Sequence, residues 1–191
     1  LVGTQLISKG FHFPNLNCII VLDIDLTSQG HDLRSAEKNL QLYHQLSGRA
    51  GRTGKPANVY FQTFNIKPEV INQFTNDDPF KFLEYELKLR KRNSLPPYER
   101  FISLILYSEN EELLNIESVK LKKNISSKMN EKILGPVNAP IFKINRKYRS
   151  RLLIRAKKTS KIQEKLKKIL NEIKFPKGMK LIVDVDPISF N

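Results

Sequence analysis

The sequence predicts an α/β lobe followed by a small α+β domain of the ferredoxin-like type. Three observations support this prediction. A strand, a helix and a strand follow one another between Cys18 and Phe64, a Pro-Pro pair interrupts the chain at Pro96, and a βαββαβ order comes after it. With 191 residues, 40% of them hydrophobic, the chain can bury the cores of one or two domains.

Two strands and the helix between them make up the predicted lobe. Cys18–Leu26, CIIVLDIDL, is a β-branched run in which charge enters only at Asp23 and Asp25. This profile predicts a buried strand with carboxylates at its end. Ser35–Leu46 carries apolar residues at helical spacing, and Asn58–Phe64, NVYFQTF, reads as the second strand.

A further helix and the proline pair mark the expected domain boundary. Pro79–Arg92 has recurring apolar residues with charges between them, which predicts a helix with a broad apolar stripe. The Pro-Pro pair that follows excludes a helical conformation for the residue before it. We therefore place the boundary near Asn93, with one domain at residues 1–93 and a second at residues 94–191.

The second domain shows the order strand, helix, two extended segments, helix, strand. Its second helix has the clearest amphipathic stripe in the chain, and Thr159 or Ser160 is expected to cap it. This order predicts a split βαβ sandwich. The expected elements are Phe101–Tyr107, Glu111–Met129, Lys132–Asn145, Tyr148–Ala156, Ser160–Ile173 and Lys180–Val185.

The charge balance favours a polyanionic partner. Lysine and arginine total 33 against 19 acidic residues, a net charge of +14, which makes nucleic acid the first candidate.

Cys18 is the single cysteine, and no apolar run approaches the roughly 18 residues of a membrane helix. A single cysteine cannot form an internal disulfide, so a reducing cytosol fits best. Nothing in the sequence reads as a secretory signal. The opening LVGTQLISKG reads like the end of a strand, as if a domain were entered in its middle.

A turn rich in arginine and glycine follows the first helix. The run Gln45–Pro56, QLSGRAGRTGKP, fails the phosphate-binding P-loop pattern, because Arg49 stands where glycine is needed and Pro56 where a hydroxyl is needed. The pattern Q-x-x-G-R-x-G-R instead predicts two guanidinium groups on a tight turn, which can bind phosphate oxygens as an arginine finger does. A basic surface turn is the simpler alternative.

This turn and several other stretches carry a family resemblance. QLSGRAGR resembles motif VI of superfamily 2 helicases, and GTQLISKGFHFPNL resembles their motif V, in the expected order. The run GTQLISKGFHFP followed by DLRSAEKNLQL narrows the resemblance to the PriA family of primosomal replication-restart helicases. GPVNAPIFKINRKYRSRLLIRA and VDVDPISF are similar to that family's C-terminal domain. The resemblance implies the last part of a RecA-like helicase lobe 2 followed by a PriA-type C-terminal domain.

The resemblance implies an ATP-dependent 3′→5′ DNA helicase that recognises stalled or abandoned replication forks and initiates primosome assembly for replication restart. It implies that Arg49 and above all Arg52 reach the γ-phosphate of ATP, which is held with Mg²⁺ mainly by lobe 1. Gly48 and Gly51 would shape their turn. The family's Walker motifs and zinc-binding cysteines have no counterpart in this sequence, so we expect no zinc here and no ATPase activity from this chain alone.

Further interface residues follow from the same resemblance. Gln45 would line the ATP interface, although a purely structural role at the helix end stays open. Gly3, Thr4, Gln5 and Lys9 would belong to the motif V loop that contacts the DNA backbone. Without the resemblance, a Gly-Thr turn and a solvated lysine would be ordinary features.

Basic residues concentrate in Lys143–Lys168, where Glu164 is the single acidic residue. Such a segment can bind phosphates, and an aromatic residue within it can stack on an unpaired base. A solvated strand face is the simpler alternative. Alternation predicts that Arg151 and Arg155 share one sheet face, opposite Leu152. The candidate DNA-binding residues in this segment are Lys147, Tyr148, Arg149, Arg151 and Arg155.

The resemblance also implies partners and a location. These are branched and single-stranded DNA, the acidic tail of single-stranded-DNA-binding protein and other primosome proteins, in a bacterial cytoplasm and associated with the nucleoid. Two other functions fit the composition: a stand-alone nucleic-acid-binding module, or an adaptor that binds acidic peptide tails. Asp23 and Asp25 share a strand face, but a carboxylate at the end of a strand more often caps a helix or pairs with an arginine, and Arg34 is a candidate partner. The histidines and Cys18 lack the short ligand spacings of a zinc site, so no metal is predicted.

Overall fold

The computed structural model describes residues 2–4, 13, 16–23, 32–48, 57–64 and 78–189. The chain divides into two compact units, Leu1–Glu84 and Tyr85–Asn191. The division falls inside helix α3, Pro79–Arg92, whose bounds agree with the sequence prediction.

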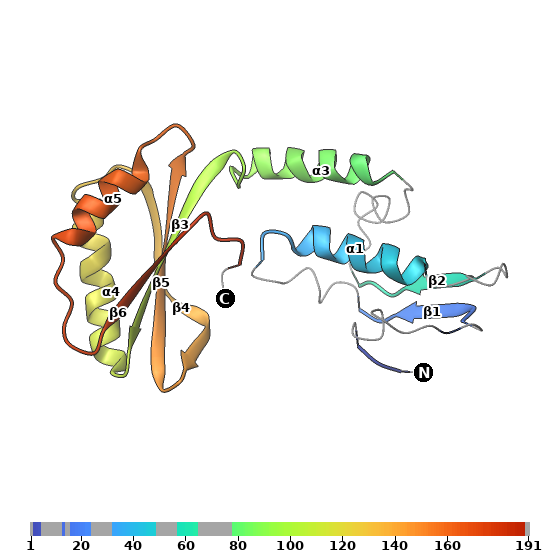
Figure 1. Ribbon diagram of the computed structural model, residues 1–191, viewed down its shortest axis with the longest axis horizontal. Coiled ribbons are helices and arrows are strands. Elements are labelled where there is room, and N and C mark those ends of the chain that lie inside the picture. Colours follow the sequence, from blue (N-terminus) through green and yellow to red (C-terminus); the bar gives the residue numbers. More distant parts are fainter. Residues whose placement is uncertain are drawn as a thin grey trace. The chain divides into compact units, whose positions relative to one another are not determined.

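The N-terminal unit contains a parallel strand–helix–strand arrangement (Figure 1). Its strands pair in register from Cys18 opposite Asn58 to Val21 opposite Phe61. Helix α1 packs on this pair, with the ring of Tyr43 edge-on to that of Phe61 at a centroid distance of 4.9 Å. The α/β lobe predicted from the sequence is therefore present in β1 (Cys18–Val21), α1 (Ser35–Ser47) and β2 (Asn58–Phe61).

Strand β1 is more exposed than the sequence predicts. Ile20 is 64% exposed and faces the same side as its pairing partner Tyr60, which is 55% exposed. Near-continuous apolar runs are typical of parallel strands covered on both faces. Helix α1 covers one face, and no other helix or strand among the described residues covers the second. The prediction of a buried strand is thus wrong for β1.

A four-stranded antiparallel sheet with two helices on one face forms the C-terminal unit (Figure 1). The strand order is β4-β5-β3-β6, and every neighbouring pair is antiparallel. This is the split βαβ arrangement predicted from the sequence. Its elements are β3 (Glu99–Ser108), α4 (Glu111–Ser126), β4 (Lys132–Ile144), β5 (Lys147–Lys157), α5 (Ile162–Asn171) and β6 (Lys180–Val185). No helix in the described ranges is long and apolar enough to cross a membrane.

The core of this unit lies between the sheet and its two helices. Alternate residues of β3 and β5 point into it, because side chains alternate between the faces of a strand. Ile102 pairs with Ile154 and Leu104 with Leu152, and all four are fully buried. From the helices the core receives Leu114, Leu121, Ile125, Ile162, Leu166 and Ile169.

The expected side-chain cap of α5 is absent. The helix begins after Lys161, which makes no capping hydrogen bond with its side chain. The backbone N–H of Ser160 donates to Lys157 O at 3.0 Å, and the Ser160 hydroxyl is buried without a hydrogen bond among the described residues. The chain turns one residue later than the sequence predicts, so α5 depends on its buried apolar stripe and not on a cap.

Gly135 sits at an irregularity in strand β4. Its φ is +92°, and a Cβ there would lie 2.6 Å from the carbonyl oxygen of Arg151. The pairing register between β4 and β5 shifts between Leu134 and Val137. Only glycine adopts this backbone and admits so close an approach, which fixes the place where β4 bends.

The contrast between two positions on α4 tests this core. Leu114 is fully buried and Ile116 is 46% exposed. We expect Leu114→Ala to lower the free energy of unfolding of the C-terminal unit by about 3 kcal/mol, because the substitution removes apolar contacts and leaves a cavity. Ile116→Ala should change it by less than about 1 kcal/mol. Urea unfolding followed by circular dichroism measures both, and equal losses would contradict the assigned core.

Candidate nucleotide and nucleic-acid interfaces

The structure describes the start of the predicted arginine turn. Helix α1 ends at Gly48, whose φ of −69° is right-handed and whose N–H donates to His44 O at 2.9 Å. A Cβ at Gly48 would lie 3.3 Å from that oxygen, so a side chain would require a small shift but no change of backbone region. Gln45 is exposed in the last turn of α1. Arg49, Gly51 and Arg52 lie outside the described residues.

The predicted motif V loop is described only in part. Gly3 and Thr4 are both exposed, whereas Gln5 and Lys9 lie outside the described residues. Among the residues that the structure describes, no three histidine, cysteine, aspartate or glutamate side chains gather as a metal site would require.

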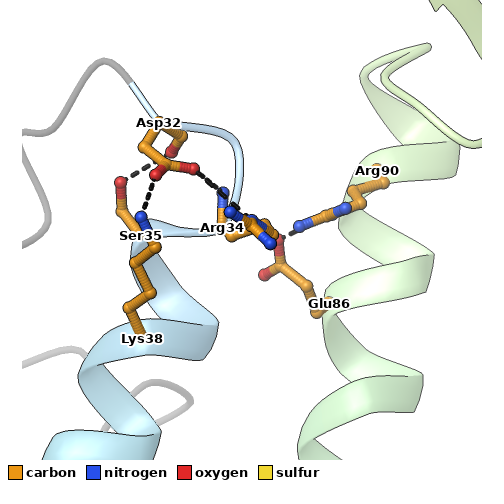
Figure 2. Close-up of polar contacts among 6 residues, drawn as sticks. All are labelled: Asp32, Arg34, Ser35, Lys38, Glu86 and Arg90. Atoms are coloured by element: carbon orange, nitrogen blue, oxygen red, sulfur yellow. Dashed lines mark hydrogen bonds and ion pairs between the residues drawn. The ribbon is translucent and has the colours of Figure 1, made fainter. Parts of the chain in front are cut away.

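A polar cluster around Asp32 holds the beginning of α1 (Figure 2). The Asp32 carboxylate accepts the backbone N–H of Arg34 at 2.8 Å and pairs with the Lys38 ammonium. The Ser35 hydroxyl donates to the Asp32 carbonyl oxygen at 2.6 Å. The hydrogen bond from Lys38 is the main cause that lowers the pKa of Asp32 below its ordinary value, against an opposing effect of burial. These residues lie in DLRSAEKNLQL, so part of that stretch serves to fix the helix that leads to the arginine turn.

The stability that the Asp32 cluster contributes depends on pH. Because folding lowers the pKa of Asp32, its contribution to stability is present above 3.8 and disappears as the pH falls through the folded pKa. Asp32→Asn should cost up to about 1 kcal/mol at pH 7 and progressively less below pH 4. Thermal unfolding of both proteins at a series of pH values measures this. A cost that does not change with pH would mean that the charge is unimportant.

Strand β5 carries its arginines on the sheet face opposite the helices, as the alternation predicts. Arg151 and Arg155 share this face, while Leu152 and Ile154 are buried in the core. Across the sheet the arginines are paired with residues of β3. Arg155 lies opposite Phe101, Arg151 opposite Ile105 and Arg149 opposite Tyr107.

Arg155 is bound within the unit. Its guanidinium donates to the carbonyl oxygens of Asn93 and Ser94 at 3.2 and 2.9 Å. It also pairs with Glu99 at 3.1 Å and lies 5.5 Å from the centroid of the Phe101 ring. These contacts fasten the segment before β3 to the sheet, so the structure gives Arg155 a role in stability that sequence reasoning missed.

Arg149 and Arg151 are neighbours of like charge. Arg149 is 4% exposed, donates to Ile141 O at 3.2 Å, and lies 5.3 Å from the centroid of the Tyr107 ring. Arg151 is half-buried, and desolvation followed by the charge of Arg149 lowers its pKa. Burial and the charge of Arg149 therefore disfavour the charged form of Arg151, and this lowers the stability of the C-terminal unit.

The aromatic residue proposed for base stacking is already in contact with its neighbours. The Lys143 ammonium lies 4.3 Å from the centroid of the Tyr148 ring and hydrogen-bonds its hydroxyl at 3.0 Å. The ring of Phe142 packs against Tyr148 at a centroid distance of 5.3 Å. Both Lys147 and Tyr148 are half-buried. An unpaired base would have to displace Lys143 to stack on the ring face that it covers.

Two substitutions on β5 distinguish an arginine that stabilises the fold from one that does not. Arg155→Gln should lower the free energy of unfolding of the C-terminal unit by about 1–3 kcal/mol, because two backbone carbonyl oxygens and the Glu99 carboxylate lose their charged donor. Arg151→Gln, on the same face of the same strand, should change it by less than about 0.5 kcal/mol or raise it. Urea unfolding measures both. Equal destabilisation by the two variants would show that Arg155 has no special structural role.

Two known protein families match this chain, one in each of its two units. Residues 1–54 match the family described as helicase conserved C-terminal domain, and this range includes the stretches that resemble motifs V and VI. Residues 91–188 match the primosomal protein N C-terminal domain. The chain belongs to this primosomal protein N family, and this agrees with the PriA-type resemblance of the sequence.

Curated relatives match the chain from end to end. A replication restart protein PriA from Rickettsia felis is 40% identical over 190 residues, 100% of this chain and 29% of the relative. The PriA proteins of Bacillus subtilis and Thermotoga maritima are 36% and 32% identical over 98% of this chain, which is 24% of each relative. The chain thus spans less than a third of the length of these relatives.

Proposed function

We propose that this chain serves in bacterial replication restart as the C-terminal part of an ATP-dependent 3′→5′ DNA helicase that recognises stalled or abandoned forks and initiates primosome assembly. One observation carries the proposal. A helicase C-terminal region and a primosomal domain follow each other in one chain, and relatives named replication restart proteins match that chain over its whole length. The expected setting is the cytoplasm, in association with the nucleoid.

The N-terminal unit contributes the phosphate contacts in this proposal. Arg49 and Arg52 stabilise charge on the γ-phosphate of ATP, bound with Mg²⁺ mainly by the other helicase lobe, and Gln45, Gly48 and Gly51 complete that interface. The exposed Gln45 at the end of α1 supports this role, because the arginine turn leaves the helix from an accessible end. The chain has no P-loop pattern, so we expect no ATP turnover from it alone.

Nucleic acid is the main ligand that we propose for both units. Gly3, Thr4, Gln5 and Lys9 contact the DNA backbone in the N-terminal unit. In the C-terminal unit, the accessible basic residues of β5 and its flanks bind the phosphates of branched and single-stranded DNA, supported by the net charge of +14. The acidic tail of single-stranded-DNA-binding protein and other primosome proteins are the proposed protein partners.

The arginine turn is tested in a chimaera in which this chain replaces the matching part of the Rickettsia felis relative. We expect Arg52→Ala to lower DNA-stimulated ATP hydrolysis by about 10³-fold or more, because one arginine finger contributes that much to phosphoryl transfer. DNA binding should be retained. Turnover is measured at matched DNA occupancy for both proteins.

Lys55→Ala is the matched control, since it removes one positive charge from the same turn. A basic surface turn predicts equal, small effects of the two substitutions. Turnover that survives Arg52→Ala would remove this arginine from the proposed mechanism. DNA binding by a chimaera without any turnover would favour the stand-alone nucleic-acid module, and displacement of DNA by an acidic peptide would favour the adaptor.

A further inference from the structure

The turn between β4 and β5 places an arginine where the backbone favours glycine. Strand β4 ends at Ile144 and β5 begins at Lys147, so Asn145 and Arg146 form a two-residue hairpin turn. Both have positive φ, 49° and 65°. Positive φ at both positions defines the type I′ turn, for which Asn-Gly is strongly preferred. Asn145 fits this preference, whereas Arg146 adopts a conformation that costs free energy for a residue with a side chain.

The β4–β5 turn extends beyond the end of β3, the strand that neighbours β5. The last residue of β3, Ser108, pairs with Tyr148, so residues 144–147 reach past the end of β3 as a two-stranded ribbon. The side chains of Ile144, Asn145 and Arg146 are exposed. Within the part of the chain that the structure describes, no carboxylate pairs with Arg146. The strained arginine therefore has no structural contact there that explains its presence.

The chemistry of the tip fits a polyanion. Lys143 and Lys147 flank Arg146, and no acidic residue lies between Lys143 and Lys161. A single strand would need aromatic faces to stack its bases, but Lys143 and Phe142 already lie against Tyr148. Duplex DNA instead offers a major groove about 12 Å wide, which admits a two-stranded β-ribbon.

We propose that the β4–β5 hairpin tip enters the major groove of duplex DNA, with Arg146 as the leading contact and the flanking lysines on phosphates. This inference rests on the proposed function, because it names the duplex contact of the C-terminal unit. The left-handed conformation of Arg146 is then retained for binding and not for folding. The expected segments Lys132–Asn145 and Tyr148–Ala156 already leave a short turn between them, but the positive φ of Arg146 is visible only in the structure.

The substitution Arg146→Gly separates binding from folding. It creates the preferred Asn-Gly turn, so the midpoint of urea unfolding should stay the same or rise. Affinity for a short blunt duplex should fall roughly fivefold or more, and the slope of log affinity against log salt should decrease by about 0.9 in magnitude. Lys158→Gly removes one charge from the turn at the other end of β5 and should have a clearly smaller effect on both quantities.

Three probes distinguish the outcomes: the blunt duplex, a single strand of the same length and a polyglutamate peptide. Loss of affinity in the Arg146→Gly variant for the duplex, with smaller losses for the other two probes, supports the proposal. Equal duplex affinity of native and variant proteins overturns it, as does a loss confined to the single strand or to the peptide. If the native chain binds none of the DNA probes, the proposed DNA-binding function of the C-terminal unit is wrong, and the hairpin proposal is wrong with it. A minor-groove ligand that displaces the protein would overturn the choice of groove.

Discussion

The hydrogen bonding of β3 to both β5 and β6 is the constraint on which the C-terminal unit depends. Its pairing with β5 runs without a break from Glu99 opposite Lys157 to Ser108 opposite Tyr148. Because side chains alternate along a strand, this register decides which residues enter the core. A slip of β5 by one residue would turn Leu152 and Ile154 away from the helices and bring arginines beneath α4 and α5. The burial of charge without a partner makes such a slip costly.

The pairing of β5 with β3 places the arginines between Arg146 and Arg155 in different environments. Arg155 reaches back to the backbone before β3, and Arg149 lies buried beside Tyr107. Arg146 stands exposed at the hairpin tip. A run of positive charge is thus not one surface: part of it holds the fold together, and part of it is available to a partner. Affinity for DNA and stability of the domain are therefore expected to respond to different arginines, although these lie within ten residues of one another in the sequence.

Local periodicity predicted most of the fold, because helices and strands with one buried face record that face in their sequence. The bounds of α3 and β6 agree with the sequence reading. Local periodicity could not predict contacts between residues that are far apart in the sequence. The bond from Arg155 to Asn93 spans 62 positions, and the exposure of Ile20 depends on which elements cover β1. Of the candidate site, the sequence identified the residue types, and the structure describes Gln45, Gly48 and the β5 arginines but not Arg49 or Arg52.

One face of the β1–β2 pair, which no helix or strand among the described residues covers, carries a thiol that can report on what binds there. Cys18, the single cysteine of the sequence, is exposed and lies on the same strand face as Ile20. The rate at which a thiol reacts with alkylating reagents depends on its thiolate fraction and on the access of the reagent to it. Any protein segment that comes to cover this face, from the same molecule or from another, slows that reaction. The rate of alkylation therefore reads out the assembly of this lobe without an introduced label.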